Sequence, residues 1–125
     1  MATNSEIESV LNQCYLAKDI ADLPQGINTR FSDDVEQKFS SSFLQRFALA
    51  RALIKKPRIL LLDDPMQYLD RVTEEKILSI LNSLHGKITI LMITHRPSHF
   101  KLADRTLFIK NRFVTVKTQN QIGDK

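Results

Sequence analysis

The 125-residue sequence is poor in several features, and each shortage excludes a class of structure or site. Cys14 is the single cysteine, so the chain can form neither an internal disulfide nor a thiolate metal cluster. No apolar run approaches the roughly 20 residues that a membrane-spanning helix needs. Glycine occurs only at positions 26, 86 and 123, which cannot build a glycine-rich loop around phosphate groups.

The residues that are present fit one modest domain. Hydrophobic residues make up 42% and charged residues 26% of the chain, a balance typical of a folded protein. Burial at this length is just sufficient for independent folding, so the loss of a sheet layer would leave the domain marginal. The formal charge of +4 comes from scattered basic residues. This pattern favours an ordinary solvated surface over binding to nucleic acid or to an anionic membrane.

The first part of the chain is predicted to be helical. Thr3 and Glu6 have the spacing of a capping box, which predicts a helix from about Asn4 to about Tyr15. Within it, Cys14 shares an apolar face with residues at helical spacing and is expected to be a core residue.

Further helical signals follow at intervals. A second short helix should run through Ile20 to the turn Leu23-Pro24-Gln25-Gly26. Residues 26–38 are polar and are expected to be irregular. Ser40-Ser41-Ser42 then precedes a segment rich in alanine and leucine that ends before Lys55-Lys56-Pro57. Serine favours the N-cap and alanine favours the interior, so a helix should begin at these serines.

The second half alternates strand and helix signals. Residues 59–62 and 88–93 are continuous apolar runs, which predict parallel strands buried on both faces. Residues 72–84 carry apolar side chains at helical spacing between them. Strand, helix and strand together predict one crossover unit of an α/β fold.

A hairpin is predicted to close the chain. Residues 106–110 and 113–116 read as two antiparallel strands at the sheet edge, joined by Asn111-Arg112. The predicted organisation is therefore a helical subdomain with a capped helix over 1–56, a partial α/β core over 57–117, and a polar tail over 118–125.

Two acidic residues stand where ligands gather in such sheets. Asp63 and Asp64 follow the first strand, and Thr94-His95 follows the second, so the two strand ends should be neighbours. A carboxylate after a buried strand can hold Mg²⁺ through water, and a second can orient a water for attack on phosphorus. Asp63-Asp64-Pro65 could equally be a strand cap that starts a turn, and an isolated His95 could be a surface residue.

The order of segments along the sequence argues against the interpretation of these residues as only a strand cap and a surface histidine. In sequence they are Ser40-Ser41-Ser42, Gln45-Arg46, Ala50-Arg51-Ala52-Leu53, Leu60-Leu61-Leu62-Asp63-Asp64-Pro65, Leu69-Asp70, Ile93-Thr94-His95-Arg96 and Ala103-Asp104-Arg105. This order resembles the second half of an ATP-binding cassette (ABC) transporter nucleotide-binding domain of exporter type, from about Asn4 to Lys117. The resemblance implies a P-loop NTPase-like, RecA-like partial parallel sheet flanked by helices.

The resemblance also implies roles for individual residues. Asp63 would be the Walker B aspartate that holds Mg²⁺, and Asp64 stands at the catalytic glutamate position. Asp70 would belong to the D-loop that touches an opposite monomer, and His95 would be the switch histidine at the γ-phosphate. Residues Ser40, Ser41 and Ser42 stand in the signature motif, which presents a hydroxyl and a helix N-terminus to ATP held by a partner.

The resemblance implies ATP and Mg²⁺ as cofactors, and a second nucleotide-binding domain and a transmembrane domain as partners. Nucleic acid is not expected among them. The implied location is the cytoplasmic side of the cell membrane, with this chain itself soluble and corresponding to the C-terminal portion of a longer cassette.

Departures from the family pattern predict weak or absent hydrolysis. Ser41 and Ser42 replace glycines, Phe43 replaces a glutamine, and Asp64 is one methylene shorter than glutamate. No Gly-x-x-x-x-Gly-Lys-Ser/Thr phosphate loop is present, so ATP use should require a complementing segment or partner. Without the strand that carries that loop, one sheet flank should be exposed.

The predicted function is therefore a partial, degenerate nucleotide-binding domain coupled to transport. Two alternatives stay open at this point. One is a non-catalytic module that dimerises with or regulates a complete cassette. The other is half of a chromosome-maintenance or DNA-repair ATPase, although the residues 45–57 look more like transporters and no heptads flank the chain.

Overall fold

The computed structural model describes residues 1–32 and 37–118. The chain divides into two compact units, Met1–Met92 and Ile93–Lys125. Residues 33–36 of the predicted irregular segment, and residues 119–125 of the predicted polar tail, lie outside the described residues. The predicted boundary between residues 56 and 57 lies inside the first unit and stays a prediction.

The first unit opens with two short helices, as the sequence predicts. Helix α1 spans Asn4–Gln13, and Thr3 and Glu6 form the predicted capping box at its start. Helix α2 spans Ala17–Ala21. Tyr15, in the turn between them, has a φ of 57°, and this left-handed residue lets α2 follow α1 directly.

The predicted serine-capped helix is also present. A short 3₁₀ turn, η1, covers Gly26–Asn28 after the predicted proline–glycine turn. Helix α4 spans Ser41–Leu53, and the side chain of its N-cap residue Ser40 accepts a hydrogen bond from the backbone N–H of Phe43 at 3.2 Å. This bond satisfies one of the donors that every helix start leaves free.

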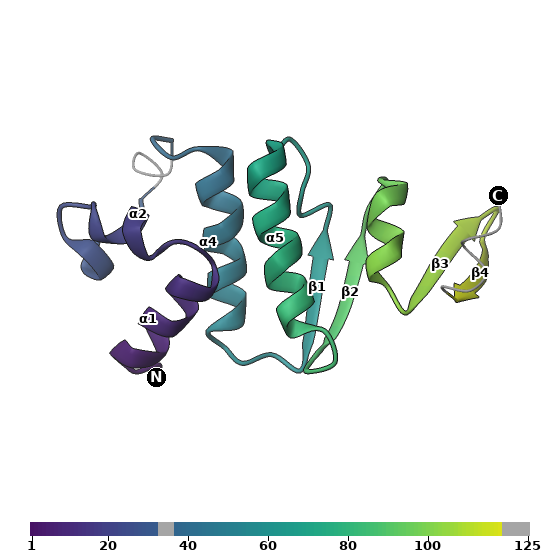
Figure 1. Ribbon diagram of the computed structural model, residues 1–125, viewed down its shortest axis with the longest axis horizontal. Helices are drawn as coiled ribbons and strands as arrows, with labels where there is room; N and C mark the ends of the chain where they lie inside the picture. Colours follow the sequence, from purple (N-terminus) through teal and green to yellow (C-terminus); the bar gives the residue numbers. More distant parts are fainter. Residues whose placement is uncertain (33–36, 119–125) are drawn as a thin grey trace. The chain divides into compact units, whose positions relative to one another are not determined.

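A strand–helix–strand unit follows α4. Strand β1 spans Ile59–Asp63, helix α5 spans Arg71–Leu84 and strand β2 spans Thr89–Ile93. The two strands pair in one sheet and run in the same direction (Figure 1). Gly86 leaves α5 with a φ of 77°, a conformation that glycine adopts without a steric cost.

The core of this unit lies between the helices and one face of the sheet. Figure 1 shows α4 and α5 running side by side next to β1 and β2. The buried apolar side chains come from α1, α2, α4, β1 and α5 and from the turns after α1 and β1. They are Leu11, Cys14, Leu16, Ile20, Phe43, Leu49, Ala50, Leu53, Leu60, Met66, Ile77, Ile80 and Leu81.

The prediction that the strands are buried on both faces is wrong. Leu60 is 3% exposed, whereas its neighbours Ile59 and Leu61 are 61% and 69% exposed, and Leu91 of β2 is 53% exposed. Successive strand residues point to opposite faces, so helices cover one face and leave the other apolar face open. We call Ile59, Leu61 and Leu91 the open sheet face.

The second unit contains a short helix and the predicted hairpin. Turn η2 spans Pro97–Leu102, and strands β3 and β4 span Arg105–Lys110 and Phe113–Thr118. The strands pair antiparallel from Arg105 with Thr118 to Lys110 with Phe113. Strands β3 and β4 form a two-stranded sheet of their own and do not pair with β1 or β2, so the predicted hairpin is present but its predicted place at the edge of the first sheet is wrong.

Within residues 1–32 and 37–118, no helix combines the length and the hydrophobicity that crossing a bilayer requires.

Candidate functional site

The three serines that are predicted to stand in the signature motif lie at the start of α4 and have different surroundings. Ser40 and Ser41 are exposed, and Ser42 is half-buried. The Ser40 hydroxyl caps the helix through the Phe43 N–H. The exposed end of α4 therefore presents Ser40 and Ser41, while Ser42 turns inward.

Asp70 occupies the equivalent position at the start of α5. Its carboxylate accepts hydrogen bonds from the hydroxyl of Thr73 at 2.8 Å and from the backbone N–H of Thr73 at 3.0 Å. These two bonds, the hydroxyl first, hold the pKa of Asp70 below its usual value, because both favour the ionised carboxylate. Asp70 is thus an exposed, charged cap at the helix end where a negative charge is most stable.

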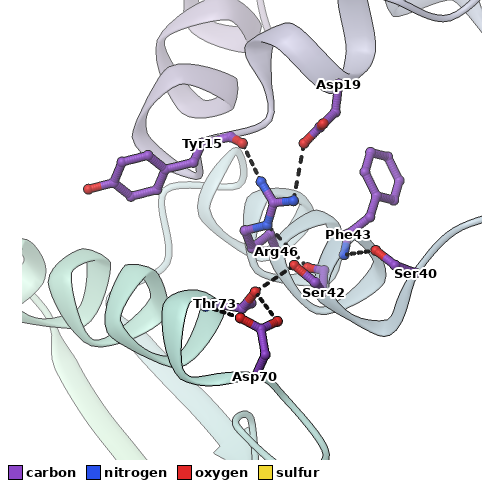
Figure 2. Close-up of polar contacts among 8 residues, drawn as sticks. All are labelled: Tyr15, Asp19, Ser40, Ser42, Phe43, Arg46, Asp70 and Thr73. Atoms are coloured by element: carbon purple, nitrogen blue, oxygen red, sulfur yellow. Dashed lines mark hydrogen bonds and ion pairs between the residues drawn. The ribbon is translucent and has the colours of Figure 1, made fainter.

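The two helix starts are joined directly. The hydroxyl of Ser42 lies 2.8 Å from the hydroxyl of Thr73, which is 4% exposed (Figure 2). The structure therefore brings together the predicted site residues Ser42 and Asp70 through Thr73, a residue that the sequence did not single out. An aspartate followed three positions later by threonine is an N-cap spacing, and that signal could have identified Thr73.

Arg46 anchors the same end of α4 from the other side. The residue is 7% exposed, and its Nε donates to the carbonyl oxygen of Ser42 at 3.1 Å. Nη2 lies 3.1 Å from Oδ2 of Asp19, and Nη1 donates to the carbonyl oxygen of Tyr15 (Figure 2). One guanidinium thus ties α4 to α2 and to the turn before it.

An aromatic cluster flanks the signature position. Phe43 is 4% exposed, and its ring stacks on that of Phe39 with centroids 4.2 Å apart. Phe31 stacks on Phe47 at 4.4 Å and contacts Phe39 at 5.3 Å. We call Phe31, Phe39, Phe43 and Phe47 the phenylalanine cluster. At the position where the resemblance implies a glutamine, Phe43 makes apolar ring contacts.

Asp63 and Asp64 lie at the carboxyl end of β1, as predicted. Asp63 is the exposed last residue of the strand, and Asp64 is half-buried with a φ of 41°. Asp64 begins a turn in which its carbonyl oxygen accepts from the N–H of Gln67 at 3.0 Å. Mg²⁺ prefers oxygen ligands, keeps several waters and needs only one or two protein carboxylates, so the exposed Asp63 fits such an ion.

His95 follows β2 in the second unit. Its side chain is exposed. Near it, the hydroxyl of Thr94 lies 2.9 Å from Nδ1 of His99, a histidine that is 3% exposed. Thr94 also accepts from the N–H of Arg96 at 3.2 Å. The loop after β2 is therefore ordered by Thr94, and the expected proximity of His95 to Asp63 stays a prediction.

Across the part of the chain that the structure describes, no three His, Cys, Asp or Glu side chains come together as ligands for one ion.

Comparison with known proteins identifies consistent relatives. The ABC transporter family model matches residues 2–67. The chain is 37% identical to the ABC multidrug transporter mdr4 of Aspergillus fumigatus over 121 residues, which is 96% of this chain and 9% of that protein. It is 37% identical to the ATP-dependent permease MDL1 of Candida albicans over 108 residues, 85% of this chain and 16% of the permease.

A solved structure shares the fold. A bacterial Atm1-family ABC exporter, determined with ATP bound, superposes with a TM-score of 0.81 at 32% identity. The match covers 95% of this chain and 21% of the exporter chain. The expected fold class, a helix-flanked partial sheet with a helical N-terminal part and a C-terminal hairpin, is therefore confirmed. The chain spans 9% of mdr4, 16% of MDL1 and 21% of the exporter chain, a minor part of the length of each.

Proposed function

Because the chain belongs to the ABC transporter family, we propose that it is a degenerate part of a nucleotide-binding domain. In this proposal it contributes to ATP binding and hydrolysis, coupled to transport, only together with a segment or partner that carries a phosphate loop. The observation that carries the proposal is the joined pair of helix starts, which places Ser40 and Asp70 on two ends linked through Ser42 and Thr73.

The start of α4 is the proposed surface for the γ-phosphate of a partner's ATP. Ser40 supplies an exposed hydroxyl, and the free backbone N–H groups of the first turn favour an anion. Ser41 is exposed beside it and limits how closely phosphate approaches the backbone. Ser42 supports this surface from behind through Thr73.

Asp63 is the proposed Mg²⁺ residue, acting through the ion's water shell. When bound, Mg²⁺ would neutralise charge on the phosphate oxygens. Asp64 occupies the catalytic position with a carboxylate that is one methylene short, so hydrolysis at this site should be weak or absent. His95 keeps its predicted role as a switch histidine for a γ-phosphate, and Asp70 is assigned to contact with the second nucleotide-binding domain.

The proposed assembly follows from these assignments. A second nucleotide-binding domain would supply ATP to the α4 surface, and a transmembrane domain would couple the pair to transport on the cytoplasmic side of a membrane. The multidrug transporter and the permease among the relatives support a role in transport, and the Atm1-family exporter supports export.

A non-catalytic regulatory module is the second candidate. It is favoured by Asp64, whose left-handed backbone and short carboxylate suit a turn better than they suit water activation. In that case the chain would still present Ser40 and Asp70 to a complete partner but would add no turnover of its own.

Calorimetric titration with Mg-ATP tests the proposal. The chain alone should show no micromolar binding, and a complete exporter nucleotide-binding domain should bind ATP more tightly when the chain is present. Micromolar binding to the isolated chain would show that the missing phosphate loop is not decisive. An unchanged affinity of the complete domain would contradict both candidate functions. The two candidates differ in ATP turnover by the mixture of the chain and the complete domain, because the regulatory module would add no turnover of its own.

A matched pair of variants at Ser40 sharpens this test. Ser40→Asn and Ser40→Asp both retain an N-cap acceptor, so α4 should stay folded in each. Ser40→Asp also places a negative charge at the proposed phosphate surface. It should abolish the gain in ATP affinity, whereas Ser40→Asn should reduce it less. Equal loss in the two variants would argue against an anion at this end of α4.

A further inference from the structure

Two hydroxyl groups and one carboxylate form a hydrogen-bonded series between α4 and α5. Ser42 contacts Thr73 at 2.8 Å, and Thr73 donates to the Asp70 carboxylate at 2.8 Å (Figure 2). The ionised carboxylate can only accept, so the single proton of Thr73 is committed to Asp70. Ser42 must therefore donate to Thr73, so every hydrogen bond of the series is donated in the direction from α4 to the cap of α5.

The middle of this hydrogen-bonded series is sheltered from water, and its α4 end is anchored. Thr73 is 4% exposed and Ser42 is half-buried, whereas Asp70 is exposed, so the Thr73 hydroxyl cannot exchange its partners for solvent without cost. The carbonyl of Ser42 also accepts from the buried Arg46. Successive hydrogen bonds that polarise one another in a region of low dielectric are stronger together than apart.

Ser42 departs from the family pattern, and its hydroxyl forms a hydrogen bond with another side chain. The family pattern has glycine at this position, which offers no hydroxyl. Here the added side chain points to Thr73, 31 residues away in sequence, so its bulk is directed to α5 rather than to the exposed end of α4. The substitution therefore adds a link between two helices.

We propose that Ser42 and Thr73 are positioning residues that lock the first turn of α4 to the first turn of α5. Ser40 and Asp70 then move as one rigid surface. The link itself stands on the contacts above, and its purpose of presenting Ser40 and Asp70 to a partner's nucleotide rests on the proposed function.

Amide hydrogen exchange on the full chain tests the link. Ser42→Ala keeps the backbone carbonyl that Arg46 uses and raises helix propensity, so any loss of protection must come from the hydroxyl. The amides of Thr73 and Glu74, which bond to Asp70, should exchange about fivefold faster, the size expected for one lost hydrogen bond. Ser41→Ala, the neighbouring exposed serine, should leave them unchanged.

The effect of α5 on α4 is tested with two variants of Thr73. Thr73→Val keeps the shape and removes the hydroxyl, and it should speed exchange at Phe43 and Leu44 by a similar factor. Thr73→Ser restores the hydroxyl and should restore protection. Adding Ser42→Ala to Thr73→Val should produce little further change, because one link is lost only once. Faster exchange that is confined to the mutated helix, or uniform across the chain, would overturn the link.

A second readout separates this proposal from the proposed function. If the chain raises a complete domain's affinity for Mg-ATP, Ser42→Ala should weaken that gain about fivefold, and Thr73→Ser should not. An unchanged gain in Ser42→Ala would overturn the positioning role. If the wild-type chain gives no gain while the exchange coupling is present, the proposed function fails, the presenting role fails with it, and the helix link stands.

Discussion

The Nη2 atom of Arg46 lies 3.1 Å from Oδ2 of Asp19, and the two side chains differ sharply in exposure. Arg46 is 8% exposed at its side chain and Asp19 is 44% exposed. Loss of the arginine would therefore empty a buried position, whereas loss of the aspartate would remove a partner that water can partly replace.

Substitution of this pair should be asymmetric. Arg46→Ala should lower the free energy of unfolding by about 2–4 kcal/mol, since it removes three hydrogen bonds and a buried side chain. Asp19→Ala should cost about 1 kcal/mol. Arg46→Lys should not rescue the loss, because an ammonium cannot reproduce the planar geometry that reaches three acceptors. Urea denaturation measures all three, and equal costs for Arg46→Ala and Asp19→Ala would contradict the inferred geometry.

Neighbouring leucines of β1 offer a second matched comparison. Leu60 is 3% exposed and Leu61 is 69% exposed. Leu60→Ala should cost about 2–5 kcal/mol through a cavity in the core, and Leu61→Ala should change stability by no more than about 0.5 kcal/mol. Chemical denaturation of the two variants checks this, and a large loss in Leu61→Ala would mean that the open sheet face is covered in solution.

The backbone at Asp64 predicts a cost for restoring glutamate. With a φ of 41°, this position suits aspartate, which tolerates left-handed backbone better than longer side chains do. Asp64→Glu should lower the free energy of unfolding by about 0.5–1 kcal/mol and should give no ATP turnover in this chain alone. Asp63→Glu makes the same chemical change in ordinary strand backbone and serves as the stability control. Measurable hydrolysis by Asp64→Glu would reveal a phosphate-binding element within the chain.

Acid should weaken the start of α1. The ammonium of Lys56 and then the backbone N–H of Thr3 donate to the carboxylate of Glu6 and lower its pKa from 4.5 to about 2. A carboxyl whose folded pKa is depressed stabilises the fold above its unfolded pKa and loses that contribution as the pH falls. The stabilisation should therefore be complete above about pH 5 and should fade between there and pH 2.

The glutamine variant isolates this effect. Glu6→Gln retains a capping-box acceptor but not the charge. Its stability should lie below that of the wild type at pH 7 and converge with it near pH 2. Glu8→Gln alters an exposed glutamate of the same helix and should show a smaller pH-dependent difference. Parallel curves for wild type and Glu6→Gln would refute the role of the ion pair.

Local signals in the sequence were sufficient for much of the fold. The capping spacing of Thr3 and Glu6 located the start of α1, and the apolar period of residues 72–84 located α5 to within one residue. The antiparallel hairpin followed from two short β-rich runs. Each of these depends on residues a few positions apart, which is where periodicity and capping chemistry act.

The features that sequence did not predict depend on distant residues. Whether Leu61 is covered depends on which helices reach its side of the sheet, and an apolar run reads the same in either case. The contact of Ser42 with Thr73 spans 31 residues, and the contacts of Phe31 with Phe39 and Phe47 also join residues that are separated along the chain. The left-handed backbone of Asp64 has no marker in the sequence, because aspartate is common in turns whether or not its backbone is left-handed.

The phenylalanine cluster makes the stability of one end of α4 depend on temperature. Phe39 and Phe43 stack at 4.2 Å and bury apolar surface around the signature position. Attraction of this kind weakens on cooling, because water solvates apolar surface at less cost in the cold. The hydroxyl link to α5 does not depend on that effect. At low temperature the polar link should therefore contribute a growing share of the stability of this helix end. Loss of the Ser42 hydroxyl should then cost the most stability in the cold.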